Sequence, residues 1–433
     1  MARVDPKAVL EGRVPGRPPI GLIVGLSVSS LCAVVALSID ALFGGAGFWV
    51  GVLLAIIPIP LLIALALTLD RLEPEPPRTL AFSFMWGAGV AVLGALVLNT
   101  LGLLYVTVPI FGETEGHFVS ATFGAPLVEE TLKGAVLFVL LWTRRNEIDG
   151  FADGIIYATM VGLGFAMMEN ITYYTRAFEE GGAQQLQATF ILRGLVAPLS
   201  HPIFTSMTGL GVAYAATHRG KQVLAPLLGL FGAMVLHGLW NGATAFGLGG
   251  LGIVYLLDFC VLIVLVVIVV VERRSTVRRI EAYLPMYENT GLVTPQDVRM
   301  LRNLPSRRAA RRWARAVGGR PAGRAMQDYQ LAATELALLH MRAERGVAEP
   351  HWFATRRDAL LGLMGMARQA FLRVPPRMPG SAAPPWAPQG ASGFMPPPAG
   401  PGGFAGPGAP GGPPAPPPPP PPGPPGPPRG PYG

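Results

Sequence analysis

The chain has 433 residues, of which 51% are hydrophobic and only 14% are charged. A set of soluble domains of this length would carry about a quarter charged residues, so the composition excludes that class and indicates a polytopic membrane protein. The formal net charge is +8, and its position along the chain is more informative than its size. Cys32 and Cys260 both lie in apolar runs, so they predict neither a disulfide framework nor a zinc knuckle.

Eight apolar runs are long enough to cross a bilayer. Each has about 20 residues or more, which as a helix spans about 30 Å of hydrocarbon, where backbone groups find no water to bond. The runs are residues 20–43, 47–69, 80–110, 121–142, 150–174, 188–217, 222–246 and 251–271. We therefore expect an all-α protein with about eight transmembrane helices, in which residues 20–271 form the membrane domain and residues 1–19 a basic N-terminal segment.

Lysine and arginine are concentrated in alternate loops, and only Arg176 and Arg193 depart from this pattern. The loops on the basic side hold Arg3, Lys7, Arg13, Arg17, Arg71, Arg78, Arg144, Arg145, Arg219, Lys221, Arg273 and Arg274. Because basic loops remain in the cytoplasm, the pattern predicts a multi-pass protein of the cell membrane with both termini cytoplasmic.

Residues 272–373 are expected to form a basic cytosolic helical region. Thr294 followed by Pro295 is a typical helix start, and residues 322–345 and 352–371 have amphipathic helical patterns. Arginine outnumbers the acidic residues here, so the region is expected to lie against anionic lipid head groups, where each basic residue contributes about 1 kcal/mol. No motif supports nucleic-acid binding, and none is expected.

Residues 374–433 are rich in proline and glycine and contain a polyproline run. Such a segment cannot build a hydrophobic core, so it is predicted to be disordered with polyproline II character. It could bind a proline-recognising module or act only as a spacer.

The run 121–142 carries Glu129, Glu130 and Lys133 near its middle. A carboxylate at the centre of a membrane helix costs about 2.5–3.5 kcal/mol on insertion scales, so two adjacent ones need a use or a partner. Lys133 lies four residues after Glu129 and three after Glu130, so it can reach either on one helical face. This pairing accounts for one carboxylate and leaves the other to be explained.

Further polar residues occur in the next three runs, whereas the run 251–271 is interpreted as having nothing comparable. They are Glu169 and Asn170, then His201, then His237 and Asn241. Taken singly, an intramembrane histidine or asparagine often only joins helices, and Glu130 with Lys133 could be a structural ion pair. Three carboxylates and two histidines on four successive helices instead favour one converging acid and base site.

A water-activating site fits these residue types, because the zinc-protease motif HExxH and a nucleophilic triad are both absent. A carboxylate can act as general base on water, and a His/Asn pair on one helix face can donate to an oxyanion. Glutamate and histidine could equally hold Zn²⁺, with Glu130, Glu169, His201 and His237 as the candidate ligands. The residues alone leave both mechanisms open, and either would hydrolyse a peptide bond within the membrane.

The segments EETLK, GFAMMEN, SHPIF and HGLWN, together with the loop at residues 70–88, resemble the PrsW family of intramembrane proteases. That family is distantly similar to the CAAX prenyl endopeptidase and bacteriocin-immunity superfamily. The resemblance covers roughly residues 20–271. It implies that Glu129 or Glu130 is the base, that Lys133 partners the carboxylate, and that His237 with Asn241 binds the oxyanion.

The superfamily's FxxxH motif is altered here, since Phe165 is followed by Glu169 where a histidine would stand. His201 is then the candidate for the missing imidazole. The resemblance also implies a single-span, membrane-anchored anti-sigma factor as substrate.

Two other classes of function compete with a protease. A non-catalytic scaffold or immunity-type protein predicts that the polar residues point to separate helix interfaces. A proton-coupled transporter could use a chain of acids and histidines, but usually shows internal repeats, which are not visible here. Convergence of the glutamates, the histidines and Asn241 around one cavity would favour the protease.

Overall fold

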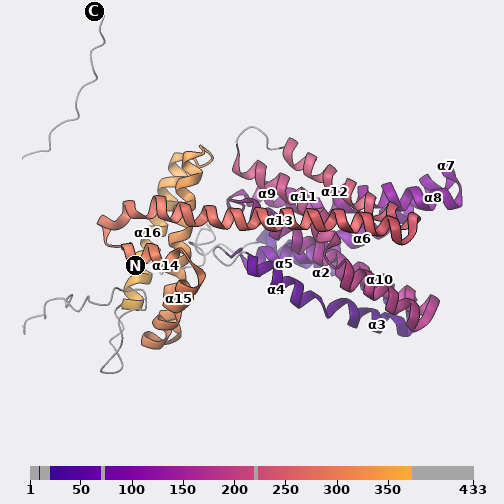
Figure 1. Ribbon diagram of the computed structural model, residues 1–433, viewed down its shortest axis with the longest axis horizontal. Helices are drawn as coiled ribbons and strands as arrows, with labels where there is room; N and C mark the ends of the chain where they lie inside the picture. Colours follow the sequence, from indigo (N-terminus) through magenta and orange to yellow (C-terminus); the bar gives the residue numbers. More distant parts are fainter. Residues whose placement is uncertain (1–8, 10–19, 70–73, 219–222, 373–433) are drawn as a thin grey trace, which may run out of the picture. The chain divides into compact units, whose positions relative to one another are not determined.

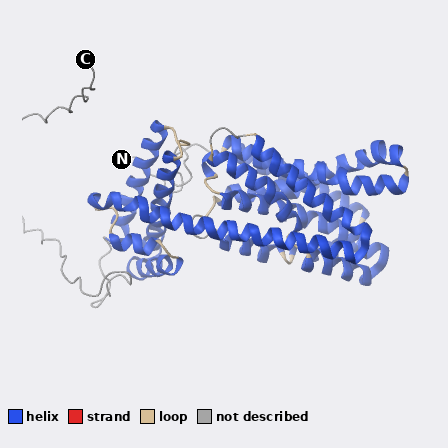
Figure 2. Ribbon diagram, turned by 45° about the horizontal axis from the view of Figure 1, so that its top comes forward, coloured by secondary structure: helices blue, strands red, loops and turns tan. Residues whose placement is uncertain are grey.

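The computed structural model describes residue 9 and residues 20–69, 74–218 and 223–372. Within these ranges the chain forms helices and loops without any strand (Figure 2), which confirms the all-α prediction for them. Most of the N-terminal segment and the proline-rich tail at residues 374–433 lie outside the described residues. The predicted domain boundaries therefore stay predictions.

Helices make up most of each of the eight predicted runs within the described residues. The helices of this part are α2 (Ile20–Phe43), α3 (Gly45–Ile56), α4 (Ile59–Leu69), α5 (Pro77–Trp86), α6 (Val92–Gly102), α7 (Val108–Phe111), α8 (Glu113–Val119), α9 (Ala125–Thr143), α10 (Phe151–Phe190), α11 (Ser200–Thr217), α12 (Leu224–Ala243) and α13 (Gly247–Tyr283). Short π-helical turns interrupt them at η1 (Gly87–Ala91), η2 (Leu103–Thr107), η3 (Ser120–Gly124) and η5 (Ile191–Val196), and 3₁₀ turns at η4 (Arg145–Glu147) and η6 (Thr244–Phe246).

Five helical stretches among the described residues are long and apolar enough to cross a membrane. They are Ile20–Phe43, Gly45–Thr68, Pro77–Phe111, Phe151–Thr217 and Leu224–Thr290. The last two each contain two of the predicted runs, and α9 is not among the five because it carries three charged residues in 19. The stretches support a multi-pass membrane protein, while the count of eight and the orientation of the termini remain predictions.

α10 and α11 form the centre of this helical bundle. In the most apolar window of Phe151–Thr217, 78% of residues are buried, against 17–22% in the other four stretches. The two backbones touch: a Cβ added at Gly154 would lie 2.2 Å from the carbonyl oxygen of Gly209, and one at Gly162 would lie 2.6 Å from the nitrogen of Pro202. This close approach fixes the start of α11 against α10.

A second group of helices follows the bundle. α13 has 37 residues and packs against both α12 and α15 (Figure 1). The group comprises η7 (Leu284–Thr290), α14 (Pro295–Leu301), α15 (Leu304–Glu344) and α16 (Pro350–Leu372). The predicted helix start is confirmed, because the hydroxyl of Thr294 accepts from the backbone N–H of Asp297 at 3.2 Å. Gly319, with φ +69°, divides α15 into two segments.

Candidate active site

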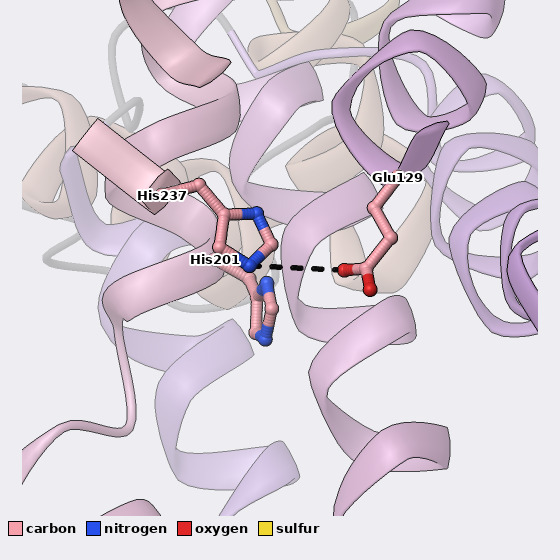
Figure 3. A group of neighbouring side chains, drawn as sticks. All are labelled: Glu129, His201 and His237. Carbon is pink, nitrogen blue, oxygen red and sulfur yellow. Dashed lines mark ion pairs between the residues drawn. The ribbon is translucent and has the colours of Figure 1, made fainter. Parts of the chain in front are cut away.

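Four helices bring six polar side chains together in the middle of the bundle. They are Glu129, Glu130 and Lys133 from α9, Glu169 from α10, His201 from α11 and His237 from α12. Figure 3 shows Glu129, His201 and His237 pointing toward one another, and all three are buried. A converging site is therefore present for these six, whereas Asn170 and Asn241 lie differently.

Glu130 has hydrogen-bond partners on both carboxylate oxygens. Its Oε1 lies 2.6 Å from Lys133 Nζ and 2.9 Å from His237 Nδ1. The hydroxyl of Thr205 donates to its Oε2 at 3.0 Å. The carboxylate is fully buried, so its charge is compensated by a cation and two hydrogen bonds, as a buried ion requires. This environment suits a carboxylate that holds other groups in place.

Glu129 differs from its neighbour in having one free oxygen. Asn99 Nδ2 donates to Oε1 at 3.2 Å, whereas the buried Oε2 has no hydrogen-bond partner. That oxygen lies 3.8 Å from His237 Nε2 (Figure 3). It also lies 3.7 Å from Lys133 Nζ. Its lone pairs are available to a proton or a cation, which makes Glu129 the better placed of the two as a base.

His201 lies between Lys133 and Glu169. Its Nδ1 is 3.0 Å from Lys133 Nζ, and because an ammonium group only donates, Nδ1 accepts. Nε2 therefore carries the proton and donates to Glu169 Oε2 at 2.8 Å. Arg193 of η5 pairs with the same carboxylate and donates from Nε to Asn170 Oδ1 at 2.7 Å. Asn170 is thus linked to the site through Arg193.

The amide of Asn241 does not face the cluster. Its Nδ2 donates to the carbonyl oxygen of Ala121 at 2.9 Å, and the residue is half-buried. In the π-helical register of η3 this carbonyl would accept from the residue five positions on, which is Pro126 and has no N–H. In this structure the amide of Asn241 therefore donates to a carbonyl that has no partner in the helix. This geometry does not support the predicted oxyanion role.

Two charged residues of the membrane bundle were not recognised as functional in the sequence. Arg193 was treated only as an exception to the loop charges, yet a cation in an apolar run is itself a sign of an acidic partner. Asp258 lies in the run 251–271, which was wrongly interpreted as having nothing comparable. It is buried on α13, and neither of its oxygens has a hydrogen-bond partner.

The charges of the site favour a bound cation. Three carboxylates, those of Glu129, Glu130 and Glu169, face two permanent cations, Lys133 and Arg193. With both histidines neutral, one negative charge is left over in a buried site. Uncompensated buried charge is costly, so a positive ion would stabilise this arrangement.

The donor set fits Zn²⁺. One ligand atom each from Glu129, His201 and His237 lies within 4.8 Å of the other two (Figure 3). Histidine ligands of zinc typically donate their second N–H to a carboxylate, and here His237 is paired with Glu130 and His201 with Glu169. The other nitrogen of His201, Nδ1, accepts from Lys133 Nζ at 3.0 Å, so a metal ion would have to displace this ammonium group to bind there. Glu130 and Glu169, which the sequence suggested as direct ligands, instead contact the outer nitrogens of the two imidazoles.

A large apolar cavity of about 930 Å³ lies beside the site. Its wall includes Pro126 and Leu127 of α9 and Gly238 and Gly242 of α12, and Val254 of α13 closes the other side. Pro126 precedes Glu129 by three residues and Gly238 directly follows His237, so the cavity reaches the helix turns that carry the polar cluster. An apolar segment could therefore approach the site from this side.

Comparison with known proteins identifies a family for the part of the chain that carries the polar cluster. A family model described as "PrsW family intramembrane metalloprotease" matches residues 75–271. This range contains all of the polar cluster and ends before the helices that follow α13.

Three curated relatives are similar over part of their length. A Protease PrsW of Oceanobacillus iheyensis is 30% identical over 153 residues, which are 35% of this chain and 66% of the relative. One of Geobacillus kaustophilus is 30% identical over 176 residues, 40% of this chain and 69% of the relative. One of Clostridioides difficile is 31% identical over 198 residues, 44% of this chain and 76% of the relative. No solved structure matches.

Proposed function

The chain belongs to the PrsW family of intramembrane metalloproteases, and from that membership and the buried site we propose that it hydrolyses a peptide bond of a membrane-anchored protein. The observation that carries the proposal is the buried Glu129 Oε2, which has no hydrogen bond and lies 3.8 Å from His237 Nε2 and 3.7 Å from Lys133 Nζ. Such an oxygen can take a proton without first breaking a hydrogen bond.

Glu129 acts as the general base in the proposed reaction. It removes one proton from a water molecule as the water oxygen attacks the scissile carbonyl carbon, and it then returns that proton to the leaving amine nitrogen. Glu130 holds His237 through Nδ1, and Glu169 holds His201 through Nε2. Lys133 contacts both Glu130 and His201, so it fixes the distance between the two halves of the site. These contacts pre-organise the groups before substrate arrives.

Zn²⁺ is the metal that this donor set would suit, with Glu129, His201 and His237 as the residues that would hold it. In that alternative Glu129 would serve as a ligand and not as the general base. When bound, zinc lowers the pKa of a bound water to near neutrality and polarises a carbonyl. The family description as a metalloprotease supports this choice.

The substrate class we propose is a single-span membrane protein, such as an anti-sigma factor. The apolar cavity beside α9 and α12 supports this, because an apolar segment leaving the lipid would be accommodated there.

Partners outside the membrane domain are proposed on charge and composition alone. We propose that the arginine-rich helices after α13 lie against anionic lipid head groups and that the proline-rich tail binds a proline-recognising module. Neither proposal involves nucleic acid.

A scaffold or a proton-coupled transporter is the alternative. A scaffold predicts polar side chains at separate helix interfaces, and the contacts among Glu130, Lys133 and His201 argue against that. A transporter would move protons across the bilayer without cutting its substrate, so the cleavage assay below separates it from a protease.

The proposal is tested by co-expressing the chain with a single-span reporter and following cleavage by immunoblot. Cleavage should be lost in Glu129→Gln and His237→Asn and kept in Glu180→Gln, which removes an exposed acid from α10. Undiminished cleavage in both site variants would refute the assignment.

A further inference from the structure

Three arginines surround a small cavity at the end of the membrane bundle. Arg145 follows α9, whereas Arg342 and Arg345 lie at the end of α15, and all three line a cavity of about 70 Å³. The remaining lining residues are apolar apart from Thr217, and no carboxylate is among them. The nearest acid with a direct contact is Asp149, whose Oδ2 lies 3.1 Å from Arg342 Nη2.

From this cavity we infer a binding site for a single phosphate group, formed jointly by Arg145, Arg342 and Arg345. Guanidinium groups present several N–H donors in a plane and bind phosphate oxygens in pairs. A volume of about 70 Å³ is roughly twice the ~30 Å³ share of one water, which accommodates a phosphate or lipid head-group phosphate but no nucleobase or peptide.

Arg145 keeps donors available for such a ligand. Its Nε and Nη2 donate to the last carbonyls of α11, at 3.1 Å to Ala216 and 2.8 Å to Ala215. These bonds satisfy the helix end and hold the guanidinium rigidly. The remaining nitrogen, Nη1, has no hydrogen bond to the described residues, and an arginine fixed in this way loses little entropy on binding an anion.

Arg345 adds a third positive charge to the cavity. No hydrogen bond or ion pair of its guanidinium is found in the part of the chain that the structure describes. Burial and the neighbouring Arg279 lower the pKa of Arg345, and burial and Arg342 lower the pKa of Arg145. Burial is the larger cause in both cases and a nearby arginine adds to it, whereas Glu272 and Asp149 act in the opposite direction on Arg345. A bound dianion would offset both the burial and the like charges.

The position of the site suggests two sources for the phosphate. Ala216 and Thr217 end α11, and Arg145 begins the turn η4 two residues after the end of α9, so the cavity lies where these helices of the membrane bundle end. This is the level of a lipid head group, and it is equally open to free phosphate on the side predicted to be cytosolic.

The test uses the full chain in nanodiscs and the variant Arg345→Gln, which removes no hydrogen bond among the described residues. Arg320→Gln is the matched control, because it removes one exposed arginine from the same helix α15. Binding of inorganic phosphate in neutral nanodiscs is measured by isothermal titration. Binding of phosphatidylglycerol is measured as retention of the lipid by protein transferred from mixed nanodiscs into detergent.

We expect Arg345→Gln to weaken binding of one of the two probes by about tenfold, the loss of one charge-assisted hydrogen bond, with Arg320→Gln unchanged. A loss confined to phosphatidylglycerol identifies the lipid as the source, and a loss for inorganic phosphate identifies the free ion. Equal losses in both variants would show that the anion responds only to the net charge of the protein, which would overturn the site. Unchanged binding of both probes in Arg345→Gln would overturn it as well.

Discussion

His237 Nδ1 lies 2.9 Å from Glu130 Oε1, while its Nε2 faces Glu129 Oε2 at 3.8 Å. One imidazole thus contacts both adjacent glutamates with different nitrogens. Successive residues on a helix are about 100° apart, so the two neighbouring carboxylates reach the imidazole from different directions. The imidazole hydrogen-bonds to Glu130, whose oxygens have other partners as well, and it faces the Glu129 oxygen that has no hydrogen bond. The two glutamates therefore have different roles.

The two glutamates should therefore respond differently to amide substitution. Glu129→Gln is expected to reduce cleavage by at least ~100-fold, the scale of a lost general base. It should lower the thermal midpoint less than Glu130→Gln does, because Glu129 Oε2 has no hydrogen bond and lies 3.7 Å from Lys133 Nζ, against 2.6 Å for Glu130 Oε1. Glu130→Gln leaves Lys133 buried without its closest counter-charge, which costs about 3–5 kcal/mol. Reporter cleavage and thermal unfolding in detergent measure the two effects, with Glu180→Gln as the control. Equal destabilisation by both substitutions would contradict the assignment.

Metal removal should separate the groups that bind the ion from those that orient its ligands. A chelator is expected to stop cleavage and added Zn²⁺ to restore it. Glu129→Gln and His237→Asn should lose the metal, measured by elemental mass spectrometry of purified protein. Glu169→Gln, which removes the carboxylate that both His201 and Arg193 contact, should weaken zinc affinity by about 10–100-fold. Full zinc content in His237→Asn would refute the proposed ligand set.

The contact between α10 and α11 should be needed for the site as well as for the fold. A Cβ at Gly162 would lie 2.6 Å from the nitrogen of Pro202 and 2.8 Å from the carbonyl carbon of His201, both backbone atoms that cannot rotate away. Gly162→Val should separate the helices, with an overpacking cost of about 1–3 kcal/mol, and should move His201 away from Glu169. Thermal unfolding and cleavage should both fall. Gly102→Val is the control, since a Cβ there meets nothing within 4 Å.

The sequence was sufficient to predict which helices carry the site. Carboxylates and histidines are so costly in apolar runs that Glu129, Lys133 and His201 were recognised from composition alone, and helical spacing predicted that Lys133 reaches both glutamates. The distances of 2.6 Å and 3.7 Å confirm that reach. Spacing could not predict which glutamate keeps an oxygen without a hydrogen bond, because the second oxygen of Glu130 accepts from Thr205, which belongs to another helix.

The missed features share one physical cause. The amide of Asn241 bonds a carbonyl that a π-helical turn leaves open, and no sequence pattern shows that register. Arg193 reaches Glu169 from 24 residues away through the turn η5. Both contacts depend on tertiary placement, which helical periodicity does not contain.

Asp258 should be a net cost to stability. Both of its oxygens are buried without a hydrogen bond, and a carboxylate in a membrane helix costs about 2.5–3.5 kcal/mol on insertion scales. Asp258→Leu is therefore expected to raise the thermal midpoint. Asp40→Leu is the matched comparison and should lower it, because Asp40 Oδ2 accepts from the hydroxyl of Thr172 at 2.8 Å. A lower midpoint in Asp258→Leu would show that its carboxylate has a partner in solution.

The helices after α13 should lose stability in mild acid through His340. Burial, assisted by the nearby Arg357, lowers the pKa of His340, whose Nε2 lies 2.7 Å from the hydroxyl of Tyr287. The folded state therefore favours neutral imidazole, whereas the unfolded chain protonates near its ordinary value of about 6.5. The stabilisation is complete above about pH 6.5 and is lost as the pH falls from there toward the lowered folded pKa.

Amide hydrogen exchange in α15, measured on the full chain, tests this between about pH 7 and 5, after correction for the intrinsic exchange rate. Protection of the residues around His340 should decrease in acid, and His340→Gln should remove that dependence. His351→Gln, at an exposed position on α16, should keep it. The same pH dependence in His340→Gln as in the unmodified chain would assign the effect to other groups.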